Sequence, residues 1–399
     1  MPQVSLPAEN ASTQEASSFG DRREFALLLA CCALDSNVAN RGIISSLLNQ
    51  TLDWERFYEL ASFHNVEPLA YSQLLTHSDQ LPEEAVRKLE RDSTRHAQRA
   101  LLLTRELLRI LRALAAKQVA GIPFKGPALA QTAYGDVSLR QFSDLDVLIR
   151  PHDCKAAADA IASLGYQPSS ELRSEIESEW IRTGYERSFD GPLGKNVLEL
   201  QWRLLPRFYA VDIEVEEFAS RASKIDLCGE KVKMLSSEDQ LLALSIHASK
   251  HAWMRLGWIS DIARIAATTP LDFALAHERA RELGVIRIVA MSLWLANGLL
   301  GCTIPKEFVD TVADQETRKI GDVVQGIVLQ GTDYPTETTA YFRLMIALRE
   351  RRSDRAKFMW RLLTTPSQSE WEAVELPKML FPLYRVVRLG RLLGRTVGV

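Results

Sequence analysis

Two aspartates lie one residue apart in an apolar run, "SDLDVLI", at 143–149. Side chains alternate between the two faces of a strand, so Asp144 and Asp146 share one face, and Leu145, Val147 and Ile149 share the other. Two ionised carboxylates at this spacing repel each other unless a cation lies between them. Mg²⁺ prefers such oxygen ligands together with substrate phosphates. The motif therefore predicts a metal site, although a solvated strand face is the simpler interpretation of the motif alone.

A third acid lies on a second alternating segment, "NVLELQW", at 196–202. Glu199 is on the face opposite Leu198, Leu200 and Trp202. Three carboxylates on two strands can hold two metal ions, and two metals can stabilise both the attacking and the leaving oxygen in phosphoryl chemistry. In this scheme Glu199 also helps to take the proton from an acceptor hydroxyl.

The segment before the aspartates, "PFKGPALAQTAY" at 123–134, reads as a strand, a Lys-Gly pair and a helix. Pro127 suits the first helical position, where its missing N–H costs nothing. Gly126 has no side chain to block close approach, and the free N–H groups of the first turn attract anions. Lys125 adds a positive charge. We therefore expect the phosphates of a nucleotide at this turn, although the residues also fit a plain helix start.

This order of elements resembles the core of the DNA polymerase β-type nucleotidyltransferase superfamily. More narrowly, it resembles the bacterial "uncharacterised nucleotidyltransferase" family. The likeness spans most of residues 22–390. The residues that carry it are Lys125, Gly126, Leu129, Tyr134, Arg140, the 143–149 segment, "VLELQWRL" at 197–204, "HASKHAW" at 247–253 and "WISDIA" at 258–263.

The resemblance implies that Asp144, Asp146 and Glu199 form the catalytic, metal-facing set for Mg²⁺ or Mn²⁺. It also implies that Lys125 and Gly126 contact the triphosphate of an NTP such as ATP. The superfamily turn usually carries Gly-Ser, whereas the Lys-Gly-Pro sequence here has no hydroxyl, so we expect the charge of Lys125 to substitute for it. The family often has His two residues after the third acid, where this chain has Gln201.

Arg140 lies four residues before Asp144. We consider two roles for it: binding a nucleotide phosphate, or pairing with Asp136.

The pattern of apolar residues predicts an α+β fold, with a small α+β unit between N-terminal and C-terminal helical regions. The resemblance implies that this unit is a mixed-sheet nucleotidyltransferase core. Residues 1–20 are polar and small and are interpreted as a disordered tail. Residues 21–118 form the N-terminal helical region and 119–206 the core. Residues 207–399 form a helical domain with one hairpin near Gly229 and a basic terminal helix.

Two histidines, His247 and His251, lie four residues apart on one predicted helix, so they face the same way. Zinc is disfavoured because Ala248 stands where a metalloprotease helix carries Glu. With Lys250 they are expected to pack at the cleft or to contact the substrate. Asp261 lies on an apolar helix face and needs a partner, which this group could supply.

The net charge of −3 gives no basic field for nucleic acid, so we expect a small-molecule, peptide or protein acceptor, and a nucleic acid such as a tRNA end is the less favoured alternative. There is no apolar stretch long enough for a transmembrane helix. Five cysteines without metal-ligand spacing indicate free thiols and a cytoplasmic location.

From Pro377 onward the chain has five basic and no acidic residues. We consider two interpretations of this segment. It forms a docked or frayed terminal helix, or it makes a peripheral contact with a membrane surface or an anionic polymer.

The main hypothesis is a Mg²⁺-dependent nucleotidyltransferase that moves an NMP from an NTP to an acceptor and releases pyrophosphate. A non-catalytic nucleotide sensor or scaffold with the same fold is the first alternative. A D-x-D glycosyltransferase is the second, and it predicts a Rossmann-like parallel sheet before the aspartates. The first part of this chain is instead predicted to be helical.

Overall fold

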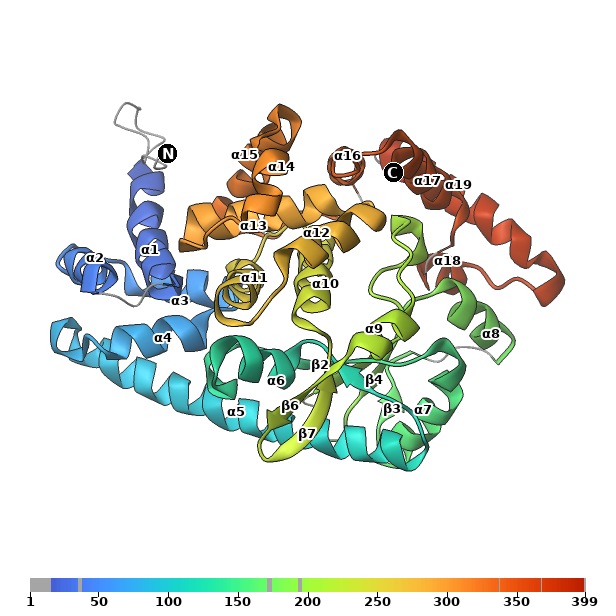
Figure 1. Ribbon diagram of the computed structural model, residues 1–399, viewed down its shortest axis with the longest axis horizontal. Coiled ribbons are helices and arrows are strands. Elements are labelled where there is room, and N and C mark those ends of the chain that lie inside the picture. The colour runs from blue at the N-terminus through green and yellow to red at the C-terminus, as the bar shows by residue number, and fades with distance from the viewer. Residues whose placement is uncertain are drawn as a thin grey trace.

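A five-stranded mixed sheet lies in the middle of the chain, with helices before and after it in the sequence (Figure 1). The computed structural model describes residues 16–34, 38–170, 174–192, 196–336, 338–366 and 368–397. Residues 1–15 of the predicted tail lie outside this range, and the first helix begins at Ala16. The predicted α+β fold class is confirmed.

In the described part of the chain, five α-helices precede the sheet, and the last of them is 34 residues long. Their bounds are α1 Ala16–Cys32, α2 Val38–Leu48, α3 Trp54–Phe63, α4 Glu67–Leu75 and α5 Glu83–Ala116. The long helix α5 runs along the lower edge of the molecule in Figure 1, beneath the sheet. Its buried residues include Leu107, Ile110 and Leu114, so one stripe of an otherwise polar helix faces the core.

The sheet has the order β1-β2-β5-β4-β3, in which only the β2/β5 pair is parallel. Among the described residues, three α-helices are interspersed with its strands. The bounds are β1 Ile122–Pro123, α6 Gly126–Leu129, β2 Asp144–Leu148, α7 Cys154–Ala162, β3 Gln167–Pro168, α8 Ser174–Thr183, β4 Glu186–Asp190 and β5 Val197–Gln201.

The two faces of the central strands differ in chemistry, as the alternation predicts. Leu145, Val147, Leu198 and Leu200 are buried and pack in one cluster with apolar residues of α5 and α7. Full burial of each such side chain contributes about 1.5–3 kcal/mol. This apolar face anchors the strands, and the acids lie on the opposite face.

The region after the sheet is helical apart from one hairpin, β6 Ser223–Leu227 with β7 Glu230–Met234. Helices α10, α11 and α13 pack against one another above the sheet in Figure 1. The helix bounds are α9 Val215–Arg221, α10 Ser237–Lys250, α11 Leu256–Thr268, α12 Phe273–Glu282, α13 Ile286–Leu300, α14 Val309–Ala313, α15 Gln315–Gln330, α16 Thr339–Ala347, α17 Arg352–Thr364, α18 Gln368–Ala373 and α19 Tyr384–Val397.

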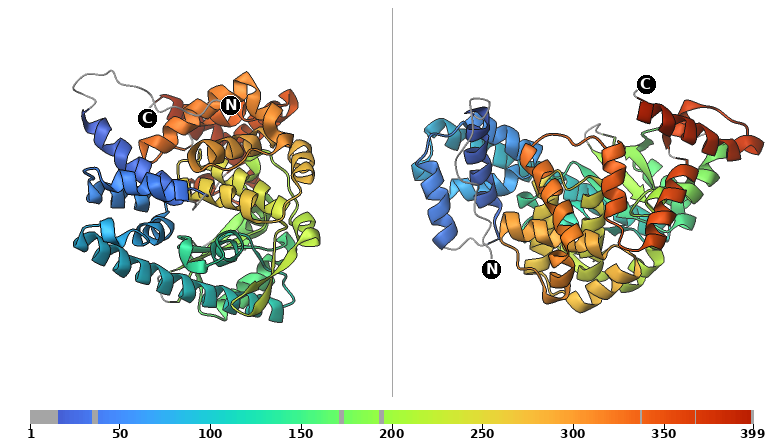
Figure 2. Two further views of the ribbon diagram at one scale, coloured as in Figure 1. Left: turned by 60° about the vertical axis from the view of Figure 1, so that its left-hand side comes forward. Right: turned by 90° about the horizontal axis from the view of Figure 1, so that it is seen from above.

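The basic terminal segment forms α19, which lies against α17 and α18 at one end of the molecule (Figures 1 and 2). Arg388 is buried and donates to Glu370 Oε2 at 3.1 Å, whereas Arg385 is exposed. The first part of the helix is therefore docked. Within the described part of the chain, every helix is too short or too polar to cross a membrane.

Candidate active site

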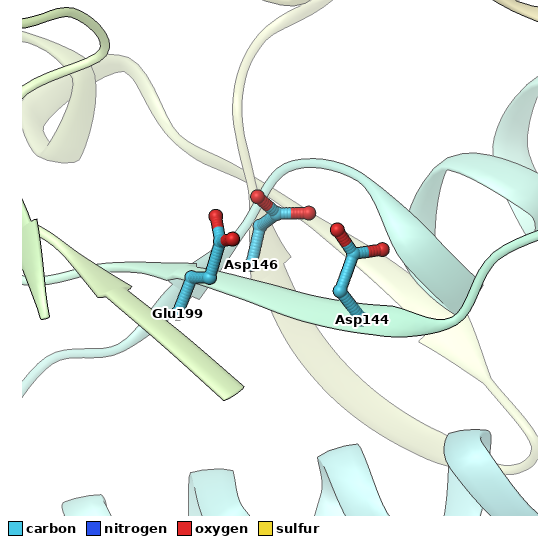
Figure 3. A group of neighbouring side chains, drawn as sticks. All are labelled: Asp144, Asp146 and Glu199. Carbon is cyan, nitrogen blue, oxygen red and sulfur yellow. The ribbon is translucent and has the colours of Figure 1, made fainter. Parts of the chain in front are cut away.

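Three carboxylates meet on the open face of the sheet. One oxygen from each of Asp144, Asp146 and Glu199 lies within 4.8 Å of the others. Figure 3 shows the three side chains rising from neighbouring strands and pointing toward one another. The two aspartates come from β2 and Glu199 comes from β5, so the expected metal-facing set is assembled by one pair of strands.

The register of the parallel pair explains this meeting. Asp146 lies opposite Glu199, and the same row continues to Ser188 on β4. Residues paired across a sheet point to the same face. A one-residue slip of β5 would move Glu199 to the buried face, which the packing of Leu198 and Leu200 prevents.

Lys125 lies inside this acidic group rather than beside it. Its Nζ donates to Asp146 Oδ1 at 2.8 Å, and the side chain is 9% exposed. Burial alone would lower the pKa of Lys125, but the carboxylates of Asp146 and Asp144 outweigh burial and raise it. Lys125 is therefore a charged ammonium that partly neutralises the cluster.

The glycine next to Lys125 has a conformational role. Gly126 is buried and has φ of 56°, in the left-handed region that favours glycine. The backbone conformation is the constraint rather than space, because a Cβ here would lie 3.6 Å from the carbonyl oxygen of Asp144, an ordinary contact. Gly126 thus allows the turn that aims Lys125 at the acids, although it is not among the residues lining the adjoining cavity.

Gln201 bridges the acids through a single amide nitrogen. Its Nε2 lies 3.1 Å from Asp146 Oδ1, 2.9 Å from Glu199 Oε2 and 3.3 Å from Glu186 Oε2. An amide nitrogen carries only two hydrogens, so the three carboxylates share two donors. Gln201 therefore holds the acids in place without adding charge.

Glu186 is a fourth acid that the sequence analysis missed. It pairs with Gln201 across β4 and β5. Burial raises the pKa of Glu186, and the nearby Lys250 opposes that shift. The alternation in "YERSFD" at 185–190 was the available signal, because it sets Glu186 and Ser188 on one face and Arg187 and Phe189 on the other.

Burial also shifts the protonation of the other acids. It raises the pKa of Asp146 to about 7, with Lys125 opposing the shift. Burial and the neighbouring Glu186 raise the pKa of Glu199. Carboxylates that take up protons this readily need additional positive charge to stay ionised.

A cavity of about 580 Å³ opens over the acids. It reaches across from the sheet to α5, which contributes His96 and Arg99, and to α10 and α11. Eight of the nine predicted site residues line it: Asp144, Asp146, Glu199, Lys125, Arg140, His247, Lys250 and His251. The volume lies within the roughly 300–1,000 Å³ that is typical of small-molecule sites.

Arg140 has a different partner from the one considered in the sequence analysis. Its Nε and Nη2 donate to the two oxygens of Asp261, each at 2.8 Å, while Asp136 accepts from the backbone N–H of Ser138. Tyr134 also donates to Asp261, at 2.7 Å. Asp261 is therefore partnered by Arg140 and Tyr134 rather than by the histidines or Lys250. This buried ion pair joins the core to α11.

His247 and His251 lie on the helical wall of the cavity, with ring centroids 5.0 Å apart. Both rings lie against Trp258. Burial lowers the pKa of His251 to about 3 and lowers that of His247 well below its usual value. Both are neutral at physiological pH. Lys250 Nζ donates to Tyr185 Oη at 3.2 Å.

The arrangement of the acidic oxygens fits a divalent cation. Asp146 Oδ2 is buried and has no hydrogen-bond partner among the described residues. Its other oxygen is already held by Lys125 and Gln201. A buried carboxylate oxygen without a partner is costly unless something binds it. Together with Asp144 and Glu199 it provides the hard oxygen donors that Mg²⁺ prefers.

A family model described as "Uncharacterised nucleotidyltransferase" matches residues 50–301. Among solved structures, the solution structure of the antibiotic-resistance factor ANT(2″)-Ia matches with 14% sequence identity and a TM-score of 0.33. This match covers 46% of this chain and 89% of that chain. A TM-score this low says nothing about a shared substrate. Comparison with curated proteins gives no match.

Proposed function

The chain belongs to the uncharacterised nucleotidyltransferase family, and we propose that it is a Mg²⁺-dependent enzyme that transfers an NMP from an NTP to an acceptor. Asp144, Asp146 and Glu199 hold the metal in this proposal. The bound metal neutralises charge on the phosphates and activates the reacting oxygens. Mn²⁺ has the same preference for oxygen ligands and is expected to substitute.

The protein residues position the reactants around the acids. Lys125 binds a phosphate of the NTP by charge, in place of the hydroxyl that is absent from the turn. An acceptor oxygen forms a bond to the α-phosphorus, and the bond from that phosphorus to the β-bridging oxygen breaks. Pyrophosphate leaves with the electron pair, and the acceptor proton passes to Glu199. Transfer of this kind depends mostly on positioning and charge neutralisation.

The observation that supports this proposal most strongly is the buried, unpartnered Oδ2 of Asp146 at the centre of the acidic group. A solvated strand face, the simpler interpretation of the aspartates, does not leave a carboxylate oxygen buried without a donor. The cavity over this atom is large enough for a nucleotide.

The experiment that tests the proposal is a transfer screen. The full chain is incubated with each α-labelled NTP in turn, Mg²⁺ or Mn²⁺, and cell extract. We expect label in one class of product and an equal amount of pyrophosphate with at least one NTP. Binding of an NTP without turnover under every condition would instead support the sensor alternative.

The glycosyltransferase alternative predicted a parallel sheet before the aspartates, whereas the described residues from 38 to 116 are helical apart from short connections.

We also propose that the protein acts in the cytoplasm on a small-molecule, peptide or protein acceptor. All five cysteines are free thiols, and Cys31 and Cys32 are buried. The net charge of −3 makes a nucleic-acid acceptor less suitable. Any membrane contact would be peripheral, through the exposed face of α19.

A further inference from the structure

A second cavity of about 220 Å³ adjoins the active-site cavity. The two share three residues, Tyr185, Lys250 and His251, so these side chains form the boundary between them. The second cavity lies on the side of this boundary away from the metal-facing acids. Its remaining walls come from α8, from the segment after β5 and from the C-terminal helical region.

This position suits the body of an acceptor. A transferase of the proposed kind must hold two substrates at once, with one acceptor oxygen reaching the acids. The larger cavity has a volume typical of one small-molecule ligand. The smaller one has room for a molecule of about monosaccharide size and none for a folded partner. The boundary residues then lie between the nucleotide and the body of the acceptor, and only the reacting acceptor oxygen reaches past them to the acids.

The charges in the smaller cavity select the kind of acceptor. Lys250 is half-buried, and its described hydrogen bond goes to Tyr185 Oη at 3.2 Å. Burial lowers the pKa of Lys250, while Glu186, on the side of the larger cavity, opposes the shift. Arg207 donates to the backbone carbonyl of Arg182 at 3.4 Å. Neither cation forms a salt bridge among the described residues, so both are available to an anion.

The remaining lining is aromatic and hydroxylated. Trp180, Phe208 and Tyr209 are buried, and Thr183 and Thr365 add hydroxyl groups. Aromatic faces contact the C–H faces of sugar-like rings, and hydroxyl groups exchange hydrogen bonds with ring hydroxyls. No carboxylate is found among the described residues of this lining, which disfavours a polycationic acceptor.

We propose that this second cavity is the acceptor subsite, and that the acceptor is a small hydroxylated ring compound carrying one phosphate or carboxylate group held by Lys250 and Arg207. The inference rests on the proposed function, because without transfer the cavity has no acceptor to hold. Of the small-molecule, peptide and protein acceptors considered above, it selects an anionic small molecule.

Binding of three probes that share one ring tests the proposal: glucose 6-phosphate, glucose and glucosamine. Dissociation constants are measured on the full chain by ligand-detected NMR, with Mg²⁺ and inorganic triphosphate present to occupy the nucleotide side. We expect glucose 6-phosphate to bind at least about tenfold more tightly than glucose, and glucosamine to bind most weakly. Arg207→Gln and Lys250→Met should each remove this preference, whereas Arg87→Gln, at an exposed position on α5, should keep it.

The proposal is overturned if glucose 6-phosphate binds no better than glucose, or if adding triphosphate to the protein with Mg²⁺ and glucose 6-phosphate alone displaces the sugar phosphate. It is also overturned if the preference survives Arg207→Gln in a variant that unfolds at the wild-type temperature. Probe binding in a protein that transfers no label from any NTP would contradict the proposed function and leave the anion site standing. Transfer of label to a cationic acceptor would instead support the proposed function and overturn the anion site.

Discussion

Lys125 Nζ lies 2.8 Å from Asp146 Oδ1, so the acidic group of Asp144, Asp146 and Glu199 contains its own positive charge. The remaining oxygen of Asp146 is buried and unpartnered among the described residues. Lys125 therefore neutralises part of the acidic cluster and still leaves one oxygen for a cation. It also repels that cation until an anionic phosphate arrives between them.

Replacing Lys125 with Met should tighten Mn²⁺ binding in the absence of nucleotide and weaken NTP binding. We expect roughly a tenfold change in each constant, because the substitution removes one full charge a few ångströms from both ligands. Isothermal titration calorimetry measures both. Lys117→Met, at an exposed position, is the control and should change neither. Weaker Mn²⁺ binding in Lys125→Met would contradict this role for Lys125.

Replacing Gln201 with Glu should destabilise the metal-free protein and increase the stabilisation that Mg²⁺ provides. The new carboxylate would lie among Asp146, Glu186 and Glu199 and would remove their shared donor. Such a loss costs about 1–3 kcal/mol. Thermal unfolding with and without Mg²⁺ measures the difference, with the exposed Gln80→Glu as control. Equal stability of the two variants without metal would rule out the bridging role of Gln201.

Removing the carboxylate of Asp261 should cost about 3–5 kcal/mol, because Arg140 would remain buried without its partner. Asp261→Ala and Asp261→Asn are compared by chemical denaturation, and the exposed Asp310→Ala is the control. We expect Asp261→Asn to lose less, since its amide oxygen can still accept one hydrogen bond. A loss below about 1 kcal/mol in Asp261→Ala would mean that Arg140 finds another partner.

The protein should lose stability as the pH falls below about 6.5, in part through His64. Burial lowers the pKa of His64 to about 3, and its Nδ1 accepts the backbone N–H of Leu256 at 3.1 Å. The unfolded state therefore binds the proton more readily than the folded state. The stabilisation is fully present above pH 6.5 and is lost progressively toward pH 3. This one group accounts for about 2 kcal/mol between pH 7.5 and pH 5.

His64→Asn tests that assignment, because the amide oxygen of Asn can accept the same N–H and does not titrate. Denaturant unfolding at pH 7.5 and pH 5 should show a smaller pH dependence in the variant than in the wild type. His152→Asn, at an exposed position, should retain the wild-type dependence. An unchanged slope in His64→Asn would show that other groups cause the acid sensitivity.

The sequence predicted most of the acidic site because its signals are local. Alternation around Asp144, Asp146 and Glu199 was enough to set each acid on a strand face, and the pairing of β2 with β5 then brought the faces together. The hairpin near Gly229 was predicted for the same reason.

Contacts between distant segments could not be predicted in this way. Arg140 and Asp261 are 121 residues apart, and nothing near either residue indicates the other. His96 and Arg99 reach the cavity from a helix that precedes the sheet, which depends on how α5 packs rather than on its own pattern. The alternation around Glu186 gives its strand face, but only the pairing of β4 with β5 shows that this face is shared with Gln201 and Glu199.

The most direct test of the proposed function is transfer of α-labelled NMP by the wild type, Asp146→Asn and Asp190→Asn, with the NTP and extract that give product in the screen. Asp190 is an exposed aspartate on the same sheet, outside the cavity. We predict that Asp146→Asn lowers the transfer rate by roughly a hundredfold or more and that Asp190→Asn keeps the wild-type rate. Label transfer at the wild-type rate by Asp146→Asn would contradict the proposed mechanism.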